Sequence, residues 1–131
     1  MRLSPRLLAC AAIVACLHAA SFAAHDAIQV DPALKRHAGQ VTALGTPDEQ
    51  GRIYSFRARR LPAAPEFTAN ELRGWRLTIL AGKRFAHVFE VQGNMGGEIT
   101  VSPLDGPLNG VAVNDVFVVE NIAVERAVNK Q

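Results

Sequence analysis

Six short runs of alternating or apolar residues, separated by clusters of Gly, Pro and Asn, constrain the fold of this 131-residue chain more than any other feature. In the most ordered stretch, Gly74–Gly93, two such runs flank the pair Gly82-Lys83, which suits a hairpin turn. Alternation with a period of two is typical of half-buried strands. The runs recur roughly every 10 residues, and they predict strands over 40–44, 52–61, 75–81, 84–91, 98–102 and 115–122. The chain is therefore predicted to be mainly β, a small antiparallel sandwich or barrel of about six strands.

The same alternation predicts which side chains face the core. The expected inward sets are Tyr54, Phe56 and Ala58; Trp75, Leu77, Ile79 and Ala81; and Phe85, His87, Phe89 and Val91. The opposite faces carry the charged residues of the same runs. His87 is thus expected to be a core residue of a hairpin, with a ligand or cleft role as the alternative.

The first 23 residues have the pattern of a secretory signal peptide. Arg2 and Arg6 precede an apolar stretch of 11 residues, Leu7–Leu17, and small residues then suit cleavage after Ala23. A transmembrane helix needs about 20 apolar residues, so this stretch is too short to span. The run "IVAC" ending at Cys16 also resembles a lipoprotein box. We expect an exported chain, periplasmic or secreted, that contacts the membrane only if Cys16 is lipidated.

Three segments are predicted along the chain. Residues 1–23 form the signal peptide, 24–39 an N-terminal arm with one short helix, and 40–131 a single β domain. The helix is expected over Asp31–Gly39, because Asp31 suits the N-cap, Pro32 the first turn and Gly39 the closing position.

Net charge excludes one class of partner. Of the 14 Lys and Arg residues, Arg2 and Arg6 lie in the signal peptide, which leaves 12 against 12 Asp and Glu. A neutral chain gives no reason to expect nucleic-acid binding. Basic residues gather in 52–84 and acidic residues in 85–131. We expect basic and acidic strands to pair across the sheet; the alternative is a dipolar surface for anionic glycans or lipid headgroups.

The candidate ligand-binding residues are Arg57, Arg59 and Arg60, near the end of one predicted strand, and Trp75, whose indole would be a sugar platform if it were exposed. Trp75 shares a face with apolar residues, so core placement competes with that role. The alternative for Arg57, Arg59 and Arg60 is that they are solvated surface residues without a ligand.

Metal and catalytic motifs are weak. The histidines beyond the signal peptide are His25, His37 and His87, without the short-range pairs of a structural zinc site. If cleavage fell after Ala24 instead, the new N-terminus at His25 would bind copper together with a second histidine, His37 or His87. No nucleophile elbow or phosphate loop is present. We therefore expect no catalytic residue, no cofactor and no enzyme activity.

One further pattern is a resemblance. "LRGWRLTILAG" (Leu72–Gly82), then "EITV" and "NDVFVV", resembles a motif of small β-rich modules in exported bacterial cell-surface or matrix proteins without assigned activity. Asn114 stands where that motif usually has Gly. The resemblance implies a non-enzymatic structural or interaction module of the envelope or matrix, which self-associates or contacts an envelope protein through edge strands. The alternative is a small protein that binds an anionic glycan or a metal ion.

Overall fold

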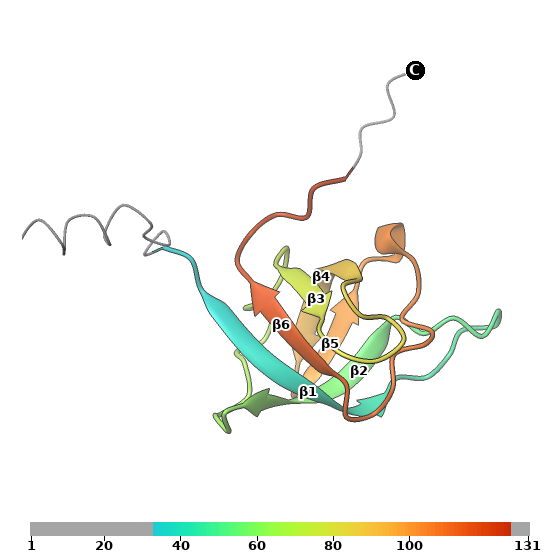
Figure 1. The fold of residues 1–131 in the computed structure, drawn as a ribbon, viewed down its shortest axis with the longest axis horizontal. Helices are drawn as coiled ribbons and strands as arrows, with labels where there is room; N and C mark the ends of the chain where they lie inside the picture. Colours follow the sequence, from blue (N-terminus) through green and yellow to red (C-terminus); the bar gives the residue numbers. More distant parts are fainter. Residues whose placement is uncertain (1–32, 127–131) are drawn as a thin grey trace, which may run out of the picture. The chain divides into compact units, whose positions relative to one another are not determined.

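The computed structural model describes residues 33–126, which contain six antiparallel strands that close into a barrel (Figure 1). The chain divides into two units, Met1–Ala33 and Leu34–Gln131, and the barrel lies in the second. Its strands are β1 Arg36–Leu44, β2 Ser55–Leu61, β3 Arg76–Ile79, β4 Val88–Met95, β5 Glu98–Val101 and β6 Val116–Glu120. Around the barrel they follow the order β1-β2-β5-β4-β3-β6, and β6 pairs back onto β1. The all-β prediction is confirmed, and the architecture is a barrel.

Alternate residues of the strands fill the barrel interior. The largest buried side chains are Phe56, Phe89 and Phe117, and the rings of Phe56 and Phe117 meet edge to face at 5.1 Å between centroids. Leu77 and Ile79 are also fully buried, as the alternation predicts. Inward alternation thus supplies most of the apolar burial that stabilises the domain.

The predicted N-terminal helix is wrong where the structure describes it. Residues 36–39 open strand β1, and Gly39 lies opposite Arg60 of β2 and Phe117 of β6. A Cβ at position 39 would lie 2.4 Å from Phe117 Cζ, so glycine is needed here because the aromatic ring occupies that space. The signal peptide, the lipoprotein box and His25 lie outside the described residues.

The prediction that His87 is a core residue is also wrong. His87 is exposed and precedes β4, whereas Phe89 and Val91 are buried. The connection from β3 to β4 is a double turn rather than a two-residue hairpin, with Ala86 at a φ of 68°. Phe85 and His87 therefore lie before the strand begins, where alternation does not apply, and Phe85 is 64% exposed.

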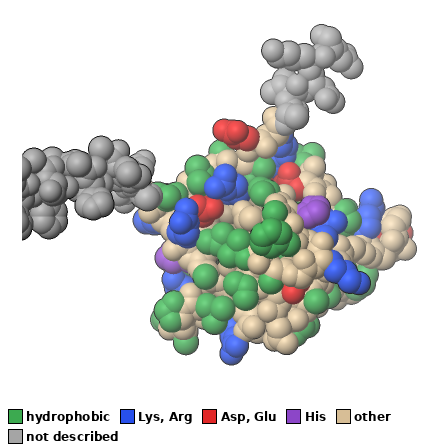
Figure 2. All heavy atoms as spheres, viewed as in Figure 1, with side chains coloured by type: hydrophobic (Ala, Val, Ile, Leu, Met, Phe, Trp, Pro, Cys, Tyr) green, Lys and Arg blue, Asp and Glu red, His purple; other side chains and the backbone are tan. Residues whose placement is uncertain are grey.

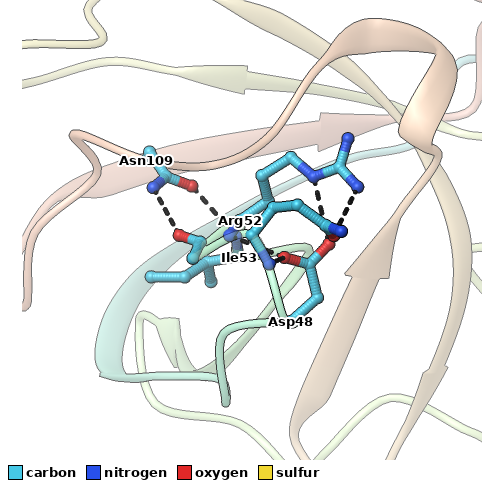
Figure 3. A network of polar contacts seen from close by, with 6 residues as sticks. Asp48, Arg52, Ile53 and Asn109 are labelled. Atoms are coloured by element: carbon cyan, nitrogen blue, oxygen red, sulfur yellow. Dashed lines mark hydrogen bonds and ion pairs between the residues drawn. The ribbon is translucent and has the colours of Figure 1, made fainter.

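The Asp48 carboxylate orders the loop between β1 and β2, and the Asn109 amide joins that loop to a second one (Figure 3). The Asp48 carboxylate accepts from the backbone N–H groups of Gln50 and Arg52. Asn109 accepts from Ile53 N–H at 2.9 Å and donates to Gly51 O at 2.9 Å. The loop between β1 and β2 is thereby fixed to the segment before β6.

Charged side chains of opposite sign do pair across the sheet, as expected. Glu120 is only 5% exposed, and its carboxylate contacts Arg36 at 2.7 Å and Arg76 at 3.0 Å from the two neighbouring strands. Burial raises the pKa of Glu120, but the hydrogen bonds from Arg36 and Arg76 outweigh it and hold the pKa below its usual value. On β4, Glu90 is bound by Arg126, which also contacts Asp105.

The outer face of β3 and β6 carries several apolar side chains. Figure 2 shows hydrophobic side chains gathered over these strands in the middle of the face. Val116 and Val118 alternate with buried neighbours on β6, and Leu80 and Val88 are exposed beside them. Among residues 33–126, no helix is long and apolar enough to cross a membrane.

Candidate ligand pocket at the open edge of strand β2

Strand β2 is longer than the strand that pairs with it on one side. β5 has four residues against seven in β2, and it pairs only with Ser55–Arg57. The last bond on this side runs from Ala58 N–H to Gly97 O at 2.9 Å. Residues 59–61 continue beyond β5 while still pairing with β1 on their other side. The barrel wall is therefore open beside the end of β2.

A pocket of about 220 Å³ lies in this opening. Two core side chains, Ile99 and Phe117, line it from the barrel interior. Ala63, Ala64 and Phe67 line it from the connection between β2 and β3. The lining is thus largely apolar, as is usual for binding sites of proteins.

The segment that follows Phe67 is held firmly against β4 by Asn94. The buried Asn94 side chain accepts from Leu72 N–H at 2.9 Å and donates to Thr68 O at 2.9 Å, and its own backbone carbonyl accepts from Asn70 N–H. The Glu71 carboxylate accepts from Thr68 N–H at 3.1 Å, which is one of the two bonds of a capping box. These bonds fix one wall of the pocket without a ligand.

A cluster around Arg60 fixes another part of the wall. The Arg60 guanidinium donates to Pro65 O and to His37 Nδ1, each at 3.1 Å, and lies 4.2 Å from the centroid of the Phe67 ring. His37 also stacks on Trp75 with centroids 6.0 Å apart. Burial and the nearby Arg60 charge lower the pKa of His37. A neutral His37 accepting from Arg60 is therefore the favoured state near neutral pH.

The four predicted ligand-binding residues do not form one surface. Arg57 and Arg59 are exposed, and the Arg59 guanidinium is bound to Gln40 Oε1. Arg60 is on the other face of β2, and Trp75 packs partly against the core. Of these four, only Arg59 and Arg60 line the pocket. Alternation could have separated Arg60 from Arg57 and Arg59, because it continues the series of Phe56 and Ala58.

Sequence reasoning missed two carboxylates, Glu66 and Glu98, that line the same pocket. Within residues 33–126 neither is in an ion pair or a hydrogen bond. A Cβ at Gly97 would lie 3.0 Å from Glu66 Oε1, and Glu98 follows Gly97 in the chain. No sequence pattern marks Glu66, which lies in a loop; Glu98 begins a strand that was predicted.

The metal hypothesis finds no geometric support in the part of the chain that the structure describes. His87 is exposed on the turn before β4, and His37 is engaged with Arg60 and the aromatic rings. No group of three His, Cys, Asp or Glu residues within 33–126 is placed to hold a metal ion.

Comparisons with protein-family models, with curated proteins and with solved structures found no match to this chain.

Proposed function

We propose that this chain is an exported, non-enzymatic interaction module that binds its partner in the pocket beside the end of β2. The observation that carries the proposal is the pocket itself, an apolar recess at the one place where β2 extends past β5. Closed barrels commonly bind ligands at such openings, where strands diverge and loops supply the walls.

The walls of the pocket support a binding role because they are already ordered. Asn94 and the Arg60 cluster hold the connection between β2 and β3 in place. A preformed site loses less conformational entropy on binding than a site that must first be ordered. The contact through edge strands that the sequence suggests is accordingly placed, in this proposal, at residues 58–61.

Site-specific photo-crosslinking tests the proposal. Ala64 lines the pocket and would be replaced by p-benzoylphenylalanine in the full chain, expressed in cells that export it. Exposed Ala112 is not among the pocket-lining residues and provides the matched control. A discrete adduct from position 64 that position 112 does not give is the expected result. Identical adducts from both positions, or none from position 64, would contradict the proposal.

Export is tested separately by the intact mass and first residue of the processed chain. A chain that begins at Ala24 with no added mass is expected from the signal peptide over residues 1–23. A diacylglyceryl-modified Cys16 would instead make the module a membrane-tethered component. Retention of Met1 on the protein in its cellular location would contradict export.

A further inference from the structure

The backbone of Arg60 faces the pocket without a partner. Ala58 donates its N–H toward β5, and peptide groups two residues apart on a strand point to the same side, so Arg60 N–H and C=O also face that side. On β1, Val41 N–H donates to Asp115 O, so Gly39, opposite Arg60, likewise faces β6 and not β2. Within residues 33–126, no backbone group outside the strand pairings forms a hydrogen bond with Arg60 N–H or C=O. The end of β2 is therefore an open strand edge.

The hydrogen-bonding side chains left free at this edge are carboxylates, although the formal charges of the lining balance, with Arg59 and Arg60 against Glu66 and Glu98. Both arginines that line the pocket are engaged, Arg59 with Gln40 and Arg60 with His37 and Pro65. The carboxylates of Glu66 and Glu98, close to Gly97, have no partner in the described residues. Arg57 is opposite Glu98 in the β2–β5 register, and the two form no ion pair within 4.0 Å. The carboxylates can therefore accept hydrogen bonds from a cationic group, whereas the arginine donors that an anion would need are already engaged.

The size of the pocket further limits the kinds of ligand that it can hold. At about 220 Å³ it is smaller than the roughly 300–1,000 Å³ of sites for drug-sized ligands. It has room for part of a ligand whose remainder lies outside. An extended peptide satisfies this condition, because its backbone adds to the strand edge while alternate side chains enter the pocket.

We propose that the partner is an extended polypeptide segment with a basic residue, which pairs its backbone with Arg60 and places its cationic side chain at Glu66 and Glu98. This inference rests on the proposed function and names its partner class. An open edge supplies backbone hydrogen bonds to any extended segment, and the two carboxylates select among such segments by charge.

Two pools of blocked pentapeptides test the inference by calorimetric titration into the exported chain. Both pools have the same mixture of Val, Thr, Ala and Leu around the centre, with a central Lys in one and a central Glu in the other. We expect saturable binding of the Lys pool that is about threefold to tenfold tighter than binding of the Glu pool, as one or two partly exposed ion pairs would give.

The charge-removing variant Glu66→Gln/Glu98→Gln should remove this preference. The matched control, Glu49→Gln/Glu125→Gln, removes two exposed carboxylates that do not line the pocket and should leave it intact. Circular dichroism of both variants should match the parent, because all four side chains are exposed.

The outcomes separate the two proposals. Equal affinity for the Lys and Glu pools, or a preference that persists in Glu66→Gln/Glu98→Gln, would overturn the cation assignment. Absence of binding by either pool, together with a specific adduct from position 64, would overturn the peptide inference and leave the pocket as the binding site. Absence of both would contradict the proposed function itself.

Discussion

Replacing Gly39 by alanine should destabilise the barrel through a single contact. The new Cβ would lie 2.4 Å from Phe117 Cζ and within 3.0 Å of the two adjacent ring atoms. Phe117 is 1% exposed and packs against Phe56, so moving its ring away from β1 would disturb that aromatic contact. Overpacking of this kind costs about 1–3 kcal/mol. Since alanine also restricts the unfolded chain, by about 0.4–1 kcal/mol, we expect a net loss of about 1–2 kcal/mol.

Urea unfolding followed by the fluorescence of Trp75, the only tryptophan, measures this loss. In thermal unfolding, the same loss should lower the Tm of a domain of this size by about 4–8 °C for each kcal/mol. Phe117→Leu removes the ring that the new methyl group meets, and alone it should cost roughly 1 kcal/mol. The double variant should therefore lose less stability than the sum of the losses measured for the two single variants. A Gly39→Ala protein as stable as the parent, or strictly additive losses, would refute this reasoning.

Three further changes in stability are expected. The pKa of His37 is lowered in the fold, so the unfolded chain binds this proton more readily than the folded chain. The free energy of unfolding should therefore fall as the pH drops below about 6.5. A His37→Gln variant whose free energy of unfolding kept the same pH dependence from pH 7.5 to 5.5 would argue against this role of His37. Glu120→Gln should cost about 1–3 kcal/mol in urea unfolding at pH 7, because Arg36 and Arg76 lose their shared carboxylate; an unchanged midpoint would be inconsistent with the pairing. Asn94→Ala leaves the buried Leu72 N–H without its acceptor and should cost about 2–3 kcal/mol; a neutral effect on Tm would show that this bond does not hold the pocket wall.

The fold class could be predicted because alternation is a direct consequence of strand geometry. The run containing Phe56 and the run containing Leu77 and Ile79 face inward as the period of two requires. Opposite charges on neighbouring strands also meet as expected, at Glu120 and Arg76.

The two errors have different physical origins: long-range contacts override the helix signal, and a local turn takes His87 out of the strand. Asp31, Pro32 and Gly39 have the spacing of helix caps, but Gly39 is required by the Phe117 ring and the segment from Arg36 pairs with two strands. His87 belongs to the same alternating series as the buried Phe89 and Val91, but it lies in the turn region before β4, where strand alternation does not apply.

The pocket was beyond sequence reasoning because it depends on unequal strand lengths. The pocket exists only because β2 extends past β5. No residue pattern in the sequence predicts at which residue the pairing of two neighbouring strands ends. Glu66 reaches the pocket from a loop that is distant in sequence from Gly97 and Glu98. Arg60 is predicted from the sequence as a residue for an anionic ligand, whereas the structure places it in the pocket lining with its guanidinium engaged by His37 and Pro65.

Amide hydrogen exchange at Arg60 tests the central claim most directly. In the free chain, Arg60 N–H should exchange rapidly while Ala58 N–H, bonded to Gly97 O, is protected. Addition of the Lys peptide pool should slow exchange at Arg60 and leave that at Ala58 unchanged. An Arg60 amide already protected in the free chain, or one that stays unprotected when the pool is saturating, would contradict binding at the open edge of β2.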